Sequence, residues 1–121
     1  MYAVFVVLNK VDYLEDILAA FVELGVRGAT IVDSQGMASA IVHGQIQDIP
    51  LFGSLKLLLD GERPYNKTIF TVIDNELLLK KTVDAVKDVM GEVSRPGVGF
   101  MFTVPVGHIY ILGEKKLPKG E

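Results

Sequence analysis

Apolar and polar residues follow the same order twice along this chain. Residues 2–8 form an apolar run without polar alternation, which predicts a strand covered on at least one face. Asp12, three residues before a glutamate, resembles the start of a capping box, and Gly25 ends the helix predicted behind it. The apolar positions of this helix are Leu14, Ile17, Leu18, Phe21 and Val22. A second strand is predicted between Gly28 and Gly36.

The same order of strand, helix and strand begins again after residue 66. Residues 67–73 are rich in β-branched side chains and predict a third strand, and Asp74 or Asn75 can cap the helix that follows. Gly91 ends this second helix, whose other face carries lysine and aspartate. Its apolar positions are Leu79, Val83, Val86 and Met90.

A glycine-rich turn precedes the last predicted strand, at residues 100–106. The turn contains Gly97 and Gly99, and glycines here can expose backbone N–H groups to an anion or simply allow a tight turn. A short apolar run follows at residues 108–112, and residues 113–121 form a polar tail.

Two strand–helix–strand rounds in 121 residues predict a single α+β domain over residues 1–121. The order favours a ferredoxin-like βαββαβ sandwich with an antiparallel sheet, both helices covering one face. The other face would carry valine and phenylalanine. Because such a face would leave a large apolar patch in water, we expect the sheets to pack together in a symmetric oligomer.

The connection between the two rounds, residues 36–66, is unusually long for a structureless loop. It has 31 residues and is too apolar for a solvated linker. One interpretation is an additional short helix or hairpin that packs on its own subunit or on a neighbour. The other is a docking arm that folds against a partner protein.

Composition narrows the functional classes. Half of the residues are apolar and 22% are charged, which indicates a folded domain, and the net charge of −3 argues against nucleic-acid binding. The chain has no cysteine, which excludes disulfides, thiol nucleophiles and cysteine-bound zinc and suits the cytoplasm. No apolar run reaches the length of about 18 residues needed for a transmembrane helix.

Candidate catalytic groups are sparse. His43 and His108 are the only histidines, and neither has metal-ligand spacing to the other or to carboxylates. No nucleophile-elbow, zinc-protease, Walker or Rossmann pattern occurs. The sequence therefore predicts a protein that is not an enzyme, and a small ferredoxin-like enzyme is the minor alternative.

Three segments taken together resemble the PII (nitrogen regulatory) signal-transduction family. They are G-A-T-I-V-D-S-Q-G-M at 28–37, K-T-I-F-T-V-I-D at 67–74 and G-V-G-F-M-F-T-V-P-V at 97–106. The resemblance implies a homotrimer of ferredoxin-like subunits with three inter-subunit clefts that bind adenine nucleotides. It also implies that residues 36–66 correspond to the T-loop, which reports ligand state to a target protein such as a transporter.

The resemblance also implies a set of ligand-binding positions, most of which offer backbone groups. Arg95 is the nearest basic side chain to them. The positions are Gly28, Thr30, Gly36, Met37, Thr71, Gly97 and Gly99.

The charged phosphate-binding residues of the family are replaced. Phe100 stands in place of a lysine, and Ile111 and Gly113 stand in place of two arginines. Because a triphosphate needs several charge-assisted contacts, we expect a less charged or different ligand, such as a nucleoside monophosphate, a cyclic dinucleotide or a small metabolite. No cofactor is assigned. The leading hypothesis is a ligand-binding regulatory protein, and the alternative is a structural or assembly trimer whose cleft is vestigial.

Overall fold

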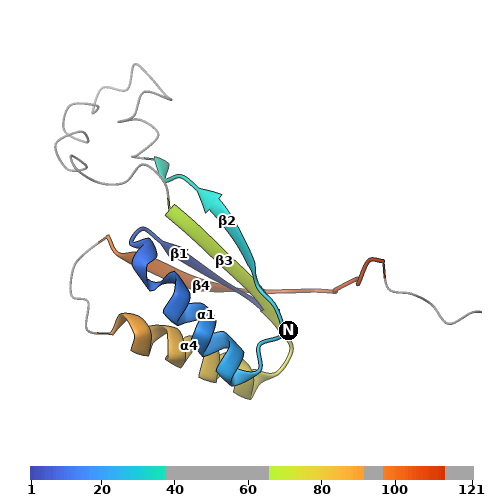
Figure 1. Ribbon diagram of the computed structural model, residues 1–121. Coiled ribbons are helices and arrows are strands. Elements are labelled where there is room, and N and C mark those ends of the chain that lie inside the picture. Colours follow the sequence, from blue (N-terminus) through green and yellow to red (C-terminus); the bar gives the residue numbers. More distant parts are fainter. Residues whose placement is uncertain (38–65, 92–96, 114–121) are drawn as a thin grey trace, which may run out of the picture.

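The computed structural model describes residues 1–37, 66–91 and 97–113, which form one antiparallel sheet and two α-helices (Figure 1). The elements in chain order are β1 (Tyr2–Leu8), the 3-10 helix η1 (Val11–Tyr13), α1 (Leu14–Leu24), β2 (Thr30–Ser34), β3 (Asn66–Ile73), α4 (Glu76–Met90) and β4 (Gly99–Pro105). The strand order is β2-β3-β1-β4, and each neighbouring pair is antiparallel. The predicted α+β class is thus confirmed.

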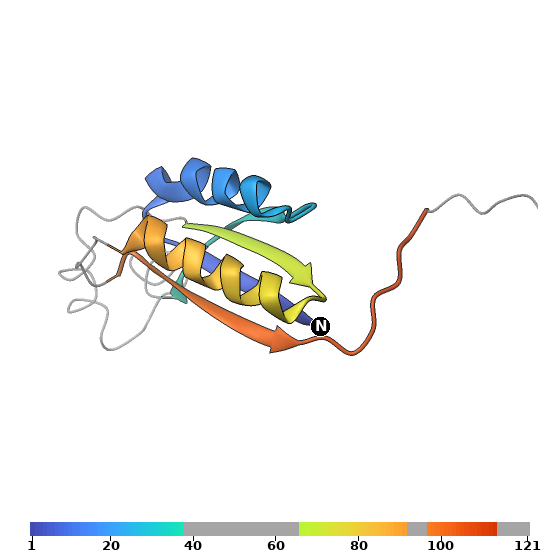
Figure 2. The same cartoon turned by 90° about the horizontal axis from the view of Figure 1, so that it is seen from below.

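Both α-helices cover the same face of the sheet (Figures 1 and 2). The central strand β1 contributes alternate buried residues to this face, and the register places Val6 opposite Ile69 of β3. α1 contributes Ile17, which is fully buried. The core residues are Val4, Val6, Leu8, Ile17, Phe21, Ile69, Ile73 and Val86. Their alternation along the strands and their helical spacing explain why one apolar core forms between two layers.

The predicted helix boundaries are confirmed at three of four places. Asn75 is the N-cap of α4, where its side chain accepts a hydrogen bond from the Leu78 N–H at 2.9 Å. Gly91 follows α4, and Gly25 ends α1 in the left-handed region with φ of 85°. The prediction for Asp12 was wrong: the chain enters α1 through η1, so Asp12 lies in that turn and Tyr13 takes the N-cap position.

The predicted core face of α1 is wrong at one residue. Val22 is 75% exposed, because it lies about 100° around the helix from Phe21, outside the stripe that faces the sheet.

Two other predicted segments differ in the structure. The second strand is shorter than predicted and spans only Thr30–Ser34. Residues 108–112 form no strand or helix, because the backbone ladder between β4 and β1 ends at the Val106 N–H, which donates to the Met1 carbonyl at 3.0 Å.

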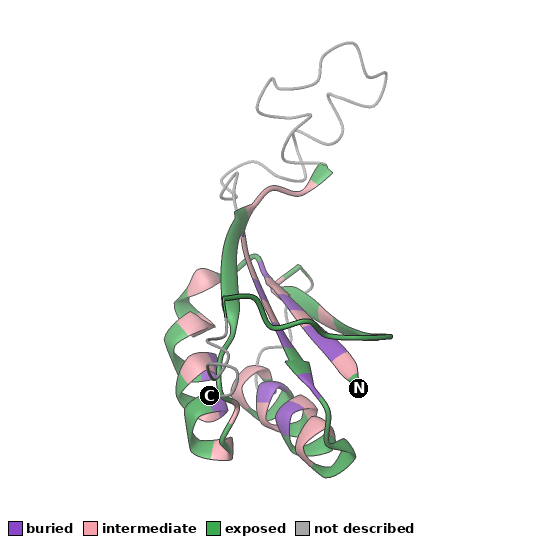
Figure 3. Ribbon diagram, turned by 90° about the vertical axis from the view of Figure 1, so that its right-hand side faces the viewer, coloured by how far each residue is buried: buried purple, intermediate pink, exposed green. Residues whose placement is uncertain are grey.

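The face of the sheet away from the helices, here called the open face, carries stacked phenylalanine rings. The ring centroid of Phe5 lies 5.5 Å from that of Phe70 and 4.9 Å from that of Phe102, and Phe100 continues the stack at 6.0 Å. Figure 3 shows exposed residues along β2 and β4. The exposed apolar side chains of the open face are Val32, Val72, Phe100, Phe102 and Val104. No described residue covers this face.

Candidate functional site

The predicted ligand-binding residues that the structure describes form two groups at opposite ends of β2. Gly28 and Thr30 lie at its beginning, next to Thr71 of β3. The Thr71 hydroxyl donates a hydrogen bond to the Gly28 carbonyl at 2.5 Å, and Thr71 is buried. Thr71 therefore holds the segment before β2 against the sheet by a hydrogen bond. The sequence did not indicate this structural role.

The second group lies where the long connection leaves the sheet. Gly36 and Met37 follow the end of β2, while Gly97 and Gly99 stand at the start of β4. Met37 is 76% exposed. Arg95 and residues 38–65, which include most of the predicted T-loop-like connection, lie outside the described residues.

A polar cluster joins the elements of this second group. It consists of Asn9, Ser34, Asn66 and Thr68 and is called here the loop-base network. The Asn66 side-chain amide donates to the Asn9 side-chain oxygen at 3.1 Å, and Asn9 in turn donates to the Gly97 carbonyl at 2.8 Å. Ser34 donates to the Asn66 side-chain oxygen and lies 2.7 Å from the Thr68 hydroxyl.

The loop-base network connects the two strand ends that flank the long connection. Ser34 ends β2 and Asn66 begins β3, so the network fixes the distance between the two ends of residues 36–66. Through Asn9 it reaches the turn at Gly97, where the Val98 carbonyl also accepts from the backbone N–H groups of residues 9 and 10. A displacement of the glycine turn would therefore change the hydrogen bonds at the base of the long connection.

Gln35 adds a buried donor beside this network. It directly follows β2, and its Nε2 atom is buried without a hydrogen-bond partner among the described residues. A buried donor left unpaired costs about 1–3 kcal/mol. Because this atom is shielded from solvent, an acceptor on a bound molecule would reach it only after a movement of the loop base.

The two glycines of the turn have different physical roles. Gly97 has φ of 82°, which favours glycine, and open space surrounds the position that a Cβ would take. A Cβ on Gly99 would lie 2.5 Å from the Val7 carbonyl oxygen, so Gly99 is required by the close approach of β4 to β1. Gly97 remains the better candidate for backbone contact with a ligand.

Two of the described cations that could attract a ligand are already paired. Lys67 forms an ion pair with Asp33, the residue opposite it in the register of β2 and β3. Lys80 of α4 pairs with Asp84 one turn further at 3.1 Å. The ion pair with Asp33 reduces the positive charge that Lys67 offers at this end of the sheet, whereas Lys80 lies on the exposed side of α4.

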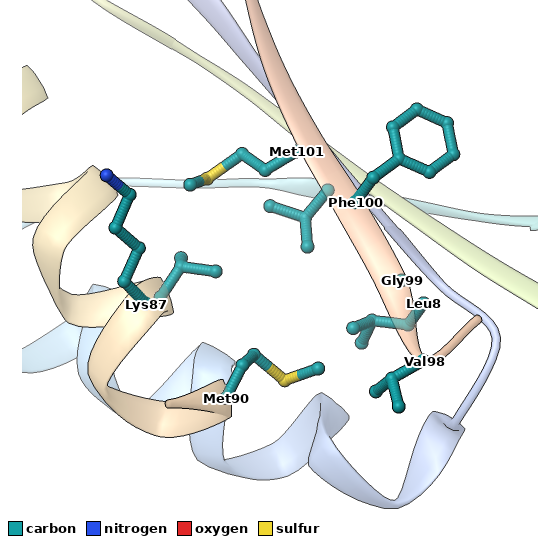
Figure 4. A pocket seen from close by; sticks show the side chains of 9 residues that line it. Leu8, Lys87, Met90, Val98, Gly99, Phe100 and Met101 are labelled. Atoms are coloured by element: carbon teal, nitrogen blue, oxygen red, sulfur yellow. The ribbon is translucent and has the colours of Figure 1, made fainter. Parts of the chain in front are cut away.

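A cavity of about 320 Å³ lies between α4 and β4, on the helix side of the sheet (Figure 4). Its wall is mostly apolar, with Leu8, Met90 and Met101 on it, and Lys87 stands at one side. Phe100 extends to the other side of β4 in this view. Among the predicted ligand-binding residues that the structure describes, Gly99 alone lines this cavity.

The described ranges hold neither a cluster of metal-ligating side chains nor a helix suited to a membrane. Residues 1–37, 66–91 and 97–113 contain no group of three or more histidines, aspartates or glutamates that could hold a metal ion. Over the same part of the chain, no helix combines the length and the apolar character that crossing a membrane requires.

The chain matches no known protein-family model and no curated protein.

Removal of the Asn66 side chain tests the loop-base network. We expect Asn66→Ala to lower the free energy of unfolding in urea by about 1–3 kcal/mol, because Asn66 is buried and its partners Ser34 and Asn9 lose a bond. It should also accelerate protease cleavage within residues 38–65. Asn75→Ala is the matched control, since loss of this helix cap costs about 1 kcal/mol without touching the network. Equal cleavage of both variants would contradict the proposed role.

Proposed function

We propose that this chain is a PII-like signalling protein rather than an enzyme. It forms a homotrimer of ferredoxin-like subunits and binds a small ligand in clefts between subunits. The ligand is an adenine nucleotide or a related molecule of low charge. Ligand binding changes how residues 36–66 meet a target protein, for which a transporter is the candidate.

The strand order supports the ferredoxin-like fold. A βαββαβ chain of this type places its two helices on one face of a sheet ordered 4-1-3-2, and β2-β3-β1-β4 is the same order read from the opposite edge. The 3-10 helix η1 only extends the entry to α1.

The open face supports assembly. Phe100 is 61% exposed and Phe102 is 43% exposed, although both belong to a stack of four aromatic rings. Complete burial of a fully exposed phenylalanine contributes on the order of 1.5–3 kcal/mol, and each of these rings would gain the share that corresponds to its exposed fraction. Packing of open faces against one another would cover the whole stack.

The position of the loop-base network carries the proposal of ligand control. A glycine turn with exposed backbone, the buried donor of Gln35 and both ends of residues 36–66 lie at one end of the sheet. A ligand that accepts from the Gln35 Nε2 atom would bind one arrangement of the loop base more tightly than others. Such a differential affinity is what a conformational switch requires.

The separation of the predicted residues favours a cleft between subunits. Gly28, Thr30 and Thr71 lie at one end of β2, and Gly36 and Gly97 lie at the other end. One copy therefore cannot place both groups around one small ligand. In a cleft between two subunits, the residues at the beginning of β2 in one copy could lie next to the residues at the end of β2 in the other copy.

The alternative function is a structural or assembly trimer with a vestigial cleft. Phe100 favours this alternative, because it stands where the family has a phosphate-binding lysine and belongs to the aromatic stack. Ile111 and Gly113, in place of the two arginines, lie in the exposed segment after β4.

A thermal-shift titration separates the two functions. We expect AMP, ATP or cyclic di-AMP to raise the Tm of the full chain, AMP or the cyclic dinucleotide more than ATP at equal concentration. Gln35→Met should keep or raise the Tm without ligand, because it removes a donor that has no partner among the described residues, and should reduce the ligand-induced shift. A stable trimer whose Tm responds to none of these nucleotides would favour the assembly function.

A further inference from the structure

The cavity between α4 and β4 exists because a side chain is missing at the edge of the sheet. In the register of β1 and β4, Gly99 lies opposite Leu8, which belongs to the core on the helix side. The two members of such a pair lie on the same face of a sheet. Because Gly99 has no side chain and β4 is an edge strand, a space of about 320 Å³ remains beside α4. Small-molecule sites have volumes of about 300–1,000 Å³, so a small ligand fits.

The wall of this cavity is apolar with one exception. Among the described residues that line it, Lys87 alone carries a charge, and none of the others has a polar side chain. Met90 on α4 and Met101 on β4 supply flexible side chains, which adapt to the shape of a bound apolar group. Such a wall accommodates an alkyl tail.

Lys87 lies at one side of the cavity, and its ammonium group has no anionic partner among the described residues. In Figure 4 its side chain extends away from Val98. Asp84, one turn earlier on α4, pairs with Lys80 at 3.1 Å. Asp88 is the next residue along the helix, and adjacent helical residues do not face each other. The site therefore offers one positive charge at its side and apolar surface elsewhere.

We infer that this cavity binds a small monocarboxylate with an apolar tail, such as a medium-chain fatty acid. The carboxylate pairs with Lys87, and the tail lies between α4 and β4. A single lysine balances the one charge of a carboxylate, whereas a phosphate group needs further donors that the described wall lacks. The site lies within one subunit on the helix side of the sheet, so it is separate from the proposed inter-subunit cleft and independent of the trimer.

Methionine methyl groups can report both the place and the affinity of binding. The chain has four methionines, of which Met90 and Met101 line the cavity, whereas Met1 and Met37 do not. In full-length protein labelled with ¹³C at the methionine methyl groups, we expect sodium octanoate to shift the NMR signals of Met90 and Met101 only. Replacement of one methionine at a time by leucine assigns the signals. Absence of any shift, or shifts at Met1 or Met37 instead, would overturn the inference.

A series of ligands in the same titration tests the tail and the head separately. Each methylene added between butanoate and octanoate should lower the Kd by up to about fourfold, the effect of moving one methylene out of water. Octylammonium has the same length of tail and the opposite charge, and it should bind at least about fivefold more weakly than octanoate. Equal Kd values for octanoate and octylammonium would show that the cavity does not recognise a carboxylate.

Two lysine variants test the role assigned to Lys87. Lys87→Met removes the charge from an exposed position and keeps a good helix former, so the Tm without ligand should be retained. The Kd for octanoate should rise about two- to fivefold. Lys81→Met is the matched control, because it removes the same charge from an exposed position of α4 outside the cavity, and its Kd should be unchanged. If both variants have the same Kd, Lys87 does not hold the carboxylate and the inference is wrong.

Discussion

Replacement of Phe102 by aspartate is expected to convert the assembled protein into single chains. Phe102 lies in the middle of the aromatic stack, between Phe5 at 4.9 Å and Phe100 at 6.0 Å. In an assembly through the open face, the new carboxylate would be buried without a partner, at a penalty on the order of several kcal/mol. Because 1.4 kcal/mol corresponds to about a tenfold change in affinity, the association constant should fall by more than about a hundredfold.

Light scattering coupled to size-exclusion chromatography measures this effect. The matched control is Leu77→Asp, because Leu77 is 62% exposed but lies on α4, on the other side of the sheet. The control should keep the mass of the natural protein. If Phe102→Asp also keeps that mass, the open face is not the contact between subunits.

Addition of one methyl group at Gly99 is expected to destabilise the fold. The Cβ of Gly99→Ala would lie 2.5 Å from the Val7 carbonyl oxygen, an atom of the neighbouring backbone that cannot turn aside. Movement of β4 away from β1 should lower the free energy of unfolding by about 1–3 kcal/mol. Urea denaturation at a fixed protein concentration measures it, since oligomer stability depends on concentration.

Gly28→Ala is the control for this substitution. Both glycines are predicted ligand-binding positions, but no atom lies within 4 Å of a Cβ built on Gly28. Its unfolding curve should therefore match that of the natural chain. If Gly99→Ala is as stable as the natural chain, the close approach of β4 to β1 does not require glycine at this position. Gly99 would then again be a candidate for backbone contact with a ligand.

Much of the fold could be predicted because local rules and burial agree along this sequence. The strand at residues 2–8, the Asn75 cap and the glycines that end both helices are set by short-range patterns. Val22 and Asp12 could not be placed correctly, since the direction of α1 is fixed by Ile17 and Phe21 packing on the sheet and by the η1 turn. Tertiary contacts outweigh pattern at such positions.

The candidate site was less accessible to prediction from the sequence. The loop-base network joins Asn9 to Asn66, which are 57 positions apart, and only the register of three strands brings them together. The polar residues at the ends of apolar strands were the signal that could have indicated it. The role of Gly99 was hidden for the same reason, because its close neighbour Val7 belongs to the first strand.

Native mass spectrometry with added AMP tests the central proposal, a ligand-binding trimer, most directly. It reports the number of chains and the number of bound ligands in the same spectrum. The proposal predicts a species with three times the 13.2 kDa mass of the chain, carrying up to three nucleotides. A single chain of 13.2 kDa without bound nucleotide, under conditions in which the fold is intact, would contradict it.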